Sequence, residues 1–105
     1  MTVDVDTAMA EVLKVPSEPI RLRIVLLLSA EELCVCHLVE ELGVPQPLVS
    51  HHLRVLREAD LVGTQKWRYW TYYRLRPEKL ETVAASLGAT ALAASRSGTE
   101  RRPCC

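Results

Sequence analysis

Two cysteines one residue apart, Cys34 and Cys36, carry the clearest chemical potential in this chain, and His37 follows them directly. Thiolates are soft ligands that hold soft metal and metalloid centres, whereas imidazole suits borderline ions such as zinc. A second pair, Cys104 and Cys105, ends the sequence. Because two neighbouring thiols can also be oxidised, the pattern predicts a metal site or a redox site.

The start of the chain and its apolar runs predict where these thiols work. The first twelve residues are acidic and lack the basic and then apolar pattern of a signal peptide. The longest apolar run, residues 24–28, is far shorter than the about 20 residues that span a bilayer. We therefore expect a cytoplasmic protein without membrane contact, in which thiols are commoner than structural disulfides.

Charge is distributed unevenly, although the formal net charge is zero. Residues 1–44 contain three basic and eight acidic side chains, residues 45–76 six and two, and residues 77–105 four and three. A phosphate-binding surface requires a basic region such as the middle one. A solvated basic face without nucleic acid would have the same composition, so charge alone leaves both interpretations open.

Apolar residues at helical spacing predict two helices before the thiols. The first covers about residues 4–14. The second begins with Ser17 as its N-cap and Pro19 in its first turn, and it ends near residue 30. Arg21 is expected on its outer face, away from the apolar stripe.

A pair of short helices surrounds Gly43, which can make the turn because glycine tolerates a positive φ. The first helix of the pair covers residues 36–42 and the second about residues 45–59. The inner face of the second helix is predicted to consist of Val49, Leu53 and Leu56, and the outer face of Gln46, Ser50, His51 and Arg54. The outer face can address base edges and phosphates, whereas His52 is expected to pack inside.

Residues 61–75 alternate between the two sides of a strand, which predicts a β-hairpin. Strands near 61–66 and 70–75 would be joined around Trp67 and Arg68. Lys66 and Arg68 then lie at the tip, where a basic wing can touch phosphates or a minor groove. A solvated hairpin tip is the alternative.

A last helix is predicted over about residues 77–94, with an apolar face that suits either a dimer contact or the chain's own core. We assign it, with the first helix, to a homodimer. Residues 1–95 would thus form one domain for DNA binding and dimerisation. Residues 96–105, which include Cys104 and Cys105, would form a flexible tail.

Three segments resemble the ArsR/SmtB family of metal-responsive repressors, and specifically its arsenic-sensing branch: ELCVCHL at 32–38, VSHHLRVLREADLV at 49–62 and WTYYRL at 70–75. The resemblance covers about residues 17 to 80. It implies a homodimeric winged helix-turn-helix, mainly α with a β-hairpin, that holds double-stranded operator DNA until As(III) or Sb(III) binds. The positions that match the family's DNA contacts are Gln46, Ser50, His51 and Arg54 in the recognition helix, and Lys66 and Arg68 in the wing.

The thiol motif departs from the family pattern, which reads C-V-C-D-L-C. His37 stands at the aspartate and Val39 at the third cysteine. Two sulfurs one residue apart lie about 200° apart on an ideal helix, so they cannot converge while the turn is regular. Metalloid binding should therefore distort the start of the helix and move the helix pair. A third sulfur could come from the tail, from Cys104 or Cys105 of the same or the other subunit.

Two other mechanisms on the same fold remain open. A divalent ion such as Cd(II), Zn(II) or Ni(II) could bind Cys34, Cys36 and His37, or oxidation of the thiols could release the DNA. An enzyme is not expected, because there is no C-x-x-C beside a βαβ pattern and no G-x-G-x-x-G, G-x-S-x-G or H-E-x-x-H.

Overall fold

In the computed structural model, which describes residues 3–96, 101 and 103, the chain forms five α-helices, one short 3-10 helix and a two-stranded antiparallel hairpin. This confirms the expected fold class, mainly α with a β-hairpin. In order, the elements are α1 (Val3–Lys14), η1 (Val15–Ser17), α2 (Pro19–Leu28), α3 (Val35–Leu42), α4 (Gln46–Glu58), β1 (Val62–Trp67), β2 (Trp70–Leu75) and α5 (Glu78–Arg96).

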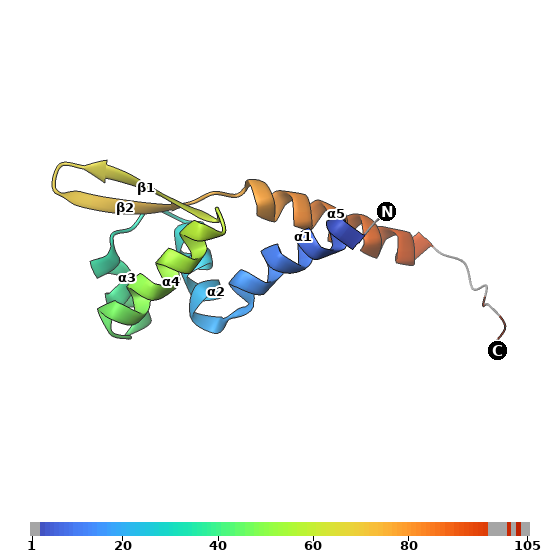
Figure 1. The fold of residues 1–105 in the computed structure, drawn as a ribbon, viewed down its shortest axis with the longest axis horizontal. Helices are drawn as coiled ribbons and strands as arrows, with labels where there is room; N and C mark the ends of the chain where they lie inside the picture. The colour runs from blue at the N-terminus through green and yellow to red at the C-terminus, as the bar shows by residue number, and fades with distance from the viewer. Residues whose placement is uncertain (1–2, 97–100, 102, 104–105) are drawn as a thin grey trace.

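The molecule is elongated, with extents of 63 × 24 × 23 Å. Figure 1 shows α2, α3 and α4 gathered below the hairpin, whereas α1 and α5 run side by side away from them. The helix pair and the hairpin that are predicted to contact DNA therefore share one part of the molecule, and α1 and α5 extend from it.

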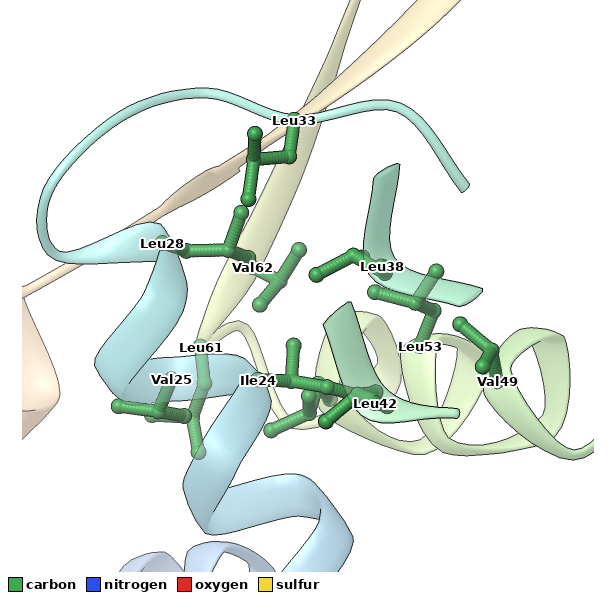
Figure 2. Close-up of a cluster of buried hydrophobic side chains, with 11 residues drawn as sticks. Ile24, Val25, Leu28, Leu33, Leu38, Leu42, Val49, Leu53, Leu61 and Val62 are labelled. Atoms are coloured by element: carbon green, nitrogen blue, oxygen red, sulfur yellow. The ribbon is translucent and has the colours of Figure 1, made fainter. Parts of the chain in front are cut away.

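Apolar side chains of α2, α3, α4 and β1 meet in one core (Figure 2). Val49, Leu53 and Leu56 of α4 are each at most 1% exposed, which confirms the predicted inner face of this helix. Ile24 of α2 and Leu38 of α3 are fully buried in the same cluster. Because truncating such a side chain costs about 2–5 kcal/mol, this core holds α4 firmly against the neighbouring helices.

The start of α2 differs from the prediction, because Glu18 and not Ser17 is the N-cap. Glu18 has extended backbone angles, φ −71° and ψ 133°, and its carboxylate accepts the backbone N–H of Arg21 at 3.0 Å. Ser17 instead ends η1, and its hydroxyl donates to the Lys14 carbonyl at 2.6 Å. The additional 3-10 turn shifts the helix start by one residue, which apolar spacing does not reveal.

Gly43 makes the turn between α3 and α4, as predicted, with φ +66°. Its N–H donates to the Val39 carbonyl at 2.9 Å and closes the last turn of α3. This left-handed conformation is one that residues with a Cβ rarely adopt. The glycine therefore determines the angle at which α4 leaves α3.

The hairpin is tighter than predicted, because Trp67 belongs to β1 and not to the turn. Trp67 pairs directly with Trp70, which leaves Arg68 and Tyr69 as the two connecting residues. Arg68 has φ 57°, a value uncommon outside glycine. The two indole rings stack with their centroids 6.0 Å apart, so an aromatic contact closes the end of the ladder.

The predicted last helix is found as α5, which runs two residues further than expected. Val83 is buried and Leu80 packs against the core, whereas Leu87 and Leu92 are about half exposed. No helix within residues 3–96 is long and apolar enough to cross a membrane. Cys104 and Cys105 lie outside the described residues, so the division into a domain and a tail stays a prediction.

Candidate DNA-binding surface and thiol site

The predicted recognition face lies on the open side of α4. Its four members are all exposed: Gln46, Ser50, His51 and Arg54. His51 Nδ1 lies 3.3 Å from Arg54 Nη2, so these two side chains form a continuous polar patch. Amide, hydroxyl, imidazole and guanidinium groups can all address base edges or phosphates. The exposure suits that role, and contact with DNA stays a prediction.

His52, on the inner side of α4, connects this helix to the start of α2. The side chain is 7% exposed, as expected for a packed residue. Its Nδ1 lies 3.0 Å from Arg21 Nη1 and 3.6 Å from the Glu18 carboxylate. Because a guanidinium can only donate, Nδ1 accepts and the neutral imidazole carries its proton on Nε2.

Arg21 was expected to point outward, and that prediction is wrong. Its Nε donates to the Val15 carbonyl at 2.6 Å, while its Nη1 reaches His52. Arg21 precedes the buried Ile24, Val25 and Leu28 by three, four and seven residues, so it lies on the buried face of α2 and not opposite it. Arg21 thus joins η1, α2 and α4 at one point and helps to fix α4 in place.

This cluster perturbs the protonation of two of its members. Burial lowers the pKa of His52, since the charged imidazolium is disfavoured away from water; Glu18 opposes this effect, and the charges of Arg21 and His51 reinforce it. Burial raises the pKa of Glu18, but two backbone N–H groups and the charges of His52 and Arg21 outweigh it, so the pKa is lowered overall. The cluster therefore favours a neutral His52 beside an ionised Glu18.

The hairpin presents a basic and aromatic tip. Lys66 and Arg68, the predicted wing residues, are exposed at its far end. Sequence reasoning missed Tyr69, which is 97% exposed in the turn. The Arg68 guanidinium lies 4.8 Å from the Trp67 ring centroid, a cation–π arrangement that orders the tip. The aromatic residues on both sides of the turn were the available signal.

Cys34 is the N-cap of α3, one position outside the helix. Its backbone is extended, with φ −82° and ψ 165°, and its sulfur accepts the backbone N–H of His37. In return His37 Nδ1 accepts the Cys34 N–H at 3.1 Å, so the two residues form a capping box. The predicted helix start at Cys36 is therefore one residue late, and the regular-helix angle between the sulfurs does not apply. The thiols still differ in surroundings, since Cys34 is buried and Cys36 exposed.

The other predicted metal ligands are less well placed. His37 uses Nδ1 for the cap, which leaves only Nε2 for an ion while the cap persists. Within the described part of the chain, no group of three or more His, Cys, Asp or Glu could hold a metal ion. Cys104 and Cys105 lie outside that part, so the source of a third ligand stays a prediction.

Tyr72 of β2 reaches the thiol site from the hairpin, a contact that sequence reasoning did not find. Burial raises the pKa of its phenol, and the charge of Cys34, a hydrogen bond with that side chain and the charge of Cys36 raise it further. Tyr72 also lines a hollow of about 570 Å³ beside α3, together with Leu33 and His37. The acidic residues that line this hollow are Glu31, Glu32, Glu40 and Glu41.

Known proteins share both the sequence and the arrangement of these elements. A family model described as "Bacterial regulatory protein, arsR family" matches residues 18–64. The arsenical resistance operon repressor of Staphylococcus xylosus is 40% identical over 79 residues, which cover 75% of this chain and 76% of that protein. The HTH-type transcriptional regulator MJ1325 of Methanocaldococcus jannaschii is 36% identical over 75 residues, or 70% of this chain and 84% of that protein. The chain belongs to the arsR family.

Solved structures of arsR-family regulators carry the same winged helix-turn-helix. The transcriptional repressor BigR from Xylella fastidiosa superposes with a TM-score of 0.70 at 31% identity, covering 91% of this chain and 94% of that one. The chain is therefore a DNA-binding transcriptional repressor of the arsR family and not an enzyme. In that fold, α3 and α4 are the helix-turn-helix, α4 is the recognition helix, and β1 and β2 are the wing.

Proposed function

We propose that this arsR-family repressor holds operator DNA with α4 and the wing and is released when As(III) or Sb(III) binds the thiolates of Cys34 and Cys36. One observation carries the proposal: the Cys34 sulfur is the N-cap acceptor of α3, the first helix of the helix-turn-helix. A metalloid that takes this sulfur competes with the hydrogen bond from the His37 N–H. The similarity to an arsenical resistance operon repressor supports the same inducer.

The chemistry needs only thiols and the inducer. Each thiol that replaces a hydroxyl ligand of arsenous acid passes its proton to that hydroxyl, so one water leaves for each As–S bond and no oxidation state changes. Because Cys34 is buried and Cys36 exposed, we expect the start of α3 to rearrange when both sulfurs bind one centre. Losing an N-cap costs about 0.5–2 kcal/mol, which is comparable to the about 1–3 kcal/mol typical of allosteric coupling.

We propose that Cys104 or Cys105 supplies the third sulfur of a trigonal site. Soft metalloids favour thiolate over imidazole, and His37 keeps Nδ1 in the capping box. A Cys104→Ser/Cys105→Ser double variant should bind As(III) more weakly than the wild type. Unchanged As(III) affinity together with unchanged release from DNA would remove these cysteines from the site.

The primary test is fluorescence anisotropy of the reduced full chain on labelled DNA from upstream of its own gene. We expect As(III) to release the DNA and Zn(II) and Cd(II) to leave it bound. Cys34→Ser and Cys36→Ser should both abolish release. Release by a divalent ion alone would instead favour a site with His37, and release by peroxide without metalloid would favour a thiol redox switch.

We also propose that two copies associate through α1 and α5. A groove of about 470 Å³ between these helices is lined by Met9, Val12 and Val83 among others, and α5 leaves Leu87 about half exposed. A second copy of the same surface would cover these apolar groups. Light scattering should give twice the chain mass of 11.8 kDa. Leu87→Glu should reduce it to that of a single chain, whereas Leu26→Glu, at an exposed leucine of α2, should not.

A further inference from the structure

A β-bridge joins the segment before α3 to the base of the wing. Leu33 donates its backbone N–H to the Tyr73 carbonyl at 3.1 Å and accepts the Tyr73 N–H at 2.8 Å. Leu33 is 8% exposed and belongs to the same core cluster as Leu28 and Val62 (Figure 2). Because Cys34 directly follows Leu33, the backbone that positions the buried thiol is also bonded to β2.

A row of side chains continues this connection toward the wing tip. At one end, Tyr72 lines the hollow beside α3 together with Leu33 and His37, the two residues that flank the thiol segment. On the hairpin its cross-strand partner is Gln65, and Trp67 pairs with Trp70. Directly paired residues and residues two apart share one face of a sheet, so Tyr72, Gln65 and both tryptophans lie on the same face. Tyr72 and Trp67 line a common hollow of about 440 Å³.

We infer that Tyr72 and the Leu33–Tyr73 bridge couple the thiol site to the wing, so that a ligand on Cys34 displaces the hairpin as well as the helix pair. Rearrangement of the α3 start displaces the Leu33–Tyr73 bridge, and it changes the hollow that Tyr72 lines with Leu33 and His37. Tyr72 is a positioning residue here and does not bind the inducer. This inference rests on the proposed function and extends it from α4 to the wing.

The coupling matters because the duplex must fit two elements at once. Bound DNA selects the arrangement in which α4 and the wing match a single groove and backbone spacing. A ligand shifts an equilibrium only by its difference in free energy between two states. Moving the wing and α4 relative to each other makes the two states differ in phosphate and groove contacts on both elements, and not on α4 alone.

The first test needs no ligand. Trp67 and Trp70 are the only two tryptophans in the chain, so intrinsic fluorescence reports on the wing. In reduced, ligand-free protein, Cys34→Ala should alter the tryptophan emission and should speed hydrogen exchange of the Tyr73 amide about fivefold, as expected for weakening one backbone hydrogen bond. The matched control Cys36→Ala, at the exposed thiol, should leave both unchanged. Equal behaviour of the two variants would overturn the inference.

The second test adds As(III) and compares Tyr72→Phe with Tyr73→Phe, which removes a hydroxyl from the neighbouring tyrosine on the opposite face. Thiolate-to-arsenic absorbance measures binding, and tryptophan emission measures the wing. In the wild type and in Tyr73→Phe, both signals should saturate together. In Tyr72→Phe the absorbance titration should be unchanged, whereas the emission change should be smaller and more As(III) should be needed to release DNA.

The outcomes separate the inference from the proposed function. If As(III) binds and releases DNA but the wild-type emission and Tyr73 exchange do not change, the coupling is wrong and the proposed function stands. A Tyr72→Phe variant that responds like the wild type also overturns the role of Tyr72. If the wild type binds no As(III), the proposed function fails, and the ligand-free comparison still decides whether Cys34 and the wing are coupled.

Discussion

Replacing Cys34 should separate its structural role from its proposed chemical role. Serine is among the best N-caps, and its hydroxyl can accept the His37 N–H that the sulfur now accepts. Alanine at this position removes both the acceptor and the thiol. The stability difference between Cys34→Ser and Cys34→Ala therefore measures the cap, while neither variant retains the thiol that the inducer needs.

The magnitude follows from the geometry of the cap. Loss of an N-cap acceptor costs about 0.5–2 kcal/mol and typically about 1. Cys34 is 6% exposed, so water replaces the lost acceptor poorly; His37 Nδ1 still accepts the N–H of residue 34, so half of the capping box survives. We therefore expect about 1 kcal/mol, which for a domain of this size corresponds to roughly 4–8 °C in Tm.

Thermal unfolding by circular dichroism under reducing conditions tests this expectation. Protein concentration must be the same for both variants, because association shifts the Tm by mass action. Cys34→Ala should melt several degrees below Cys34→Ser, and Cys34→Ser should stay on its DNA at every As(III) concentration that releases the wild type. As a control, Cys36→Ala and Cys36→Ser should melt together, since Cys36 is exposed and caps nothing. Equal Tm values for the Cys34 pair, or release of Cys34→Ser by As(III), would refute the reasoning.

Three further predictions concern the recognition helix, the buried cluster and two glycines. If Arg54 contacts a phosphate, Arg54→Ala should lower the log–log slope of operator binding against salt by about one unit. If Arg54 reads a base, the variant should relax the preference at one base pair by about 1–3 kcal/mol. Anisotropy over a salt series measures this, and an unchanged slope together with an unchanged preference would remove Arg54 from the interface. The pKa values of His52 and Glu18 are lowered in the folded chain, so the unfolded chain binds more protons as the pH falls. The free energy of unfolding should therefore fall as the pH drops below 6.5, the ordinary pKa of a histidine such as His52. It should fall again below 4.5, the ordinary pKa of a glutamate such as Glu18. Urea unfolding at a series of pH values measures both losses. His52→Gln should remove the first and reduce the second, because the charge of His52 contributes to the lowered pKa of Glu18. Gly43→Ala should destabilise by about 1–2 kcal/mol because of its left-handed backbone, whereas Gly88→Ala within α5 should stabilise by up to about 1 kcal/mol. Neither new Cβ meets an atom within 4 Å, so Tm shifts of the same sign would contradict the backbone argument.

Local patterns in the sequence were sufficient to predict most of the secondary structure. The spacing of Val49, Leu53 and Leu56 predicted the buried face of α4, and it left Arg54 on the open face. Gly43 marked the turn, and alternation after residue 60 marked the hairpin. These signals are reliable because helical and strand periods relate residues only a few positions apart, and the apolar side of each element must be buried somewhere.

Only the tertiary structure decided which distant groups meet. Arg21 reaches His52, 31 residues further along the chain, and it does so because α2 packs across α4. The phenol of Tyr72 lies near enough to Cys34 for the thiol to raise its pKa. The backbone of Leu33 is hydrogen-bonded to that of Tyr73. Both arise because the base of the hairpin packs beside α3. Each contact depends on how separately formed elements pack, and periodicity within one element contains no information about its neighbour. The sequence thus determined the helices, the wing and the two thiols, and their packing decided that one thiol is buried as a helix cap in contact with the wing.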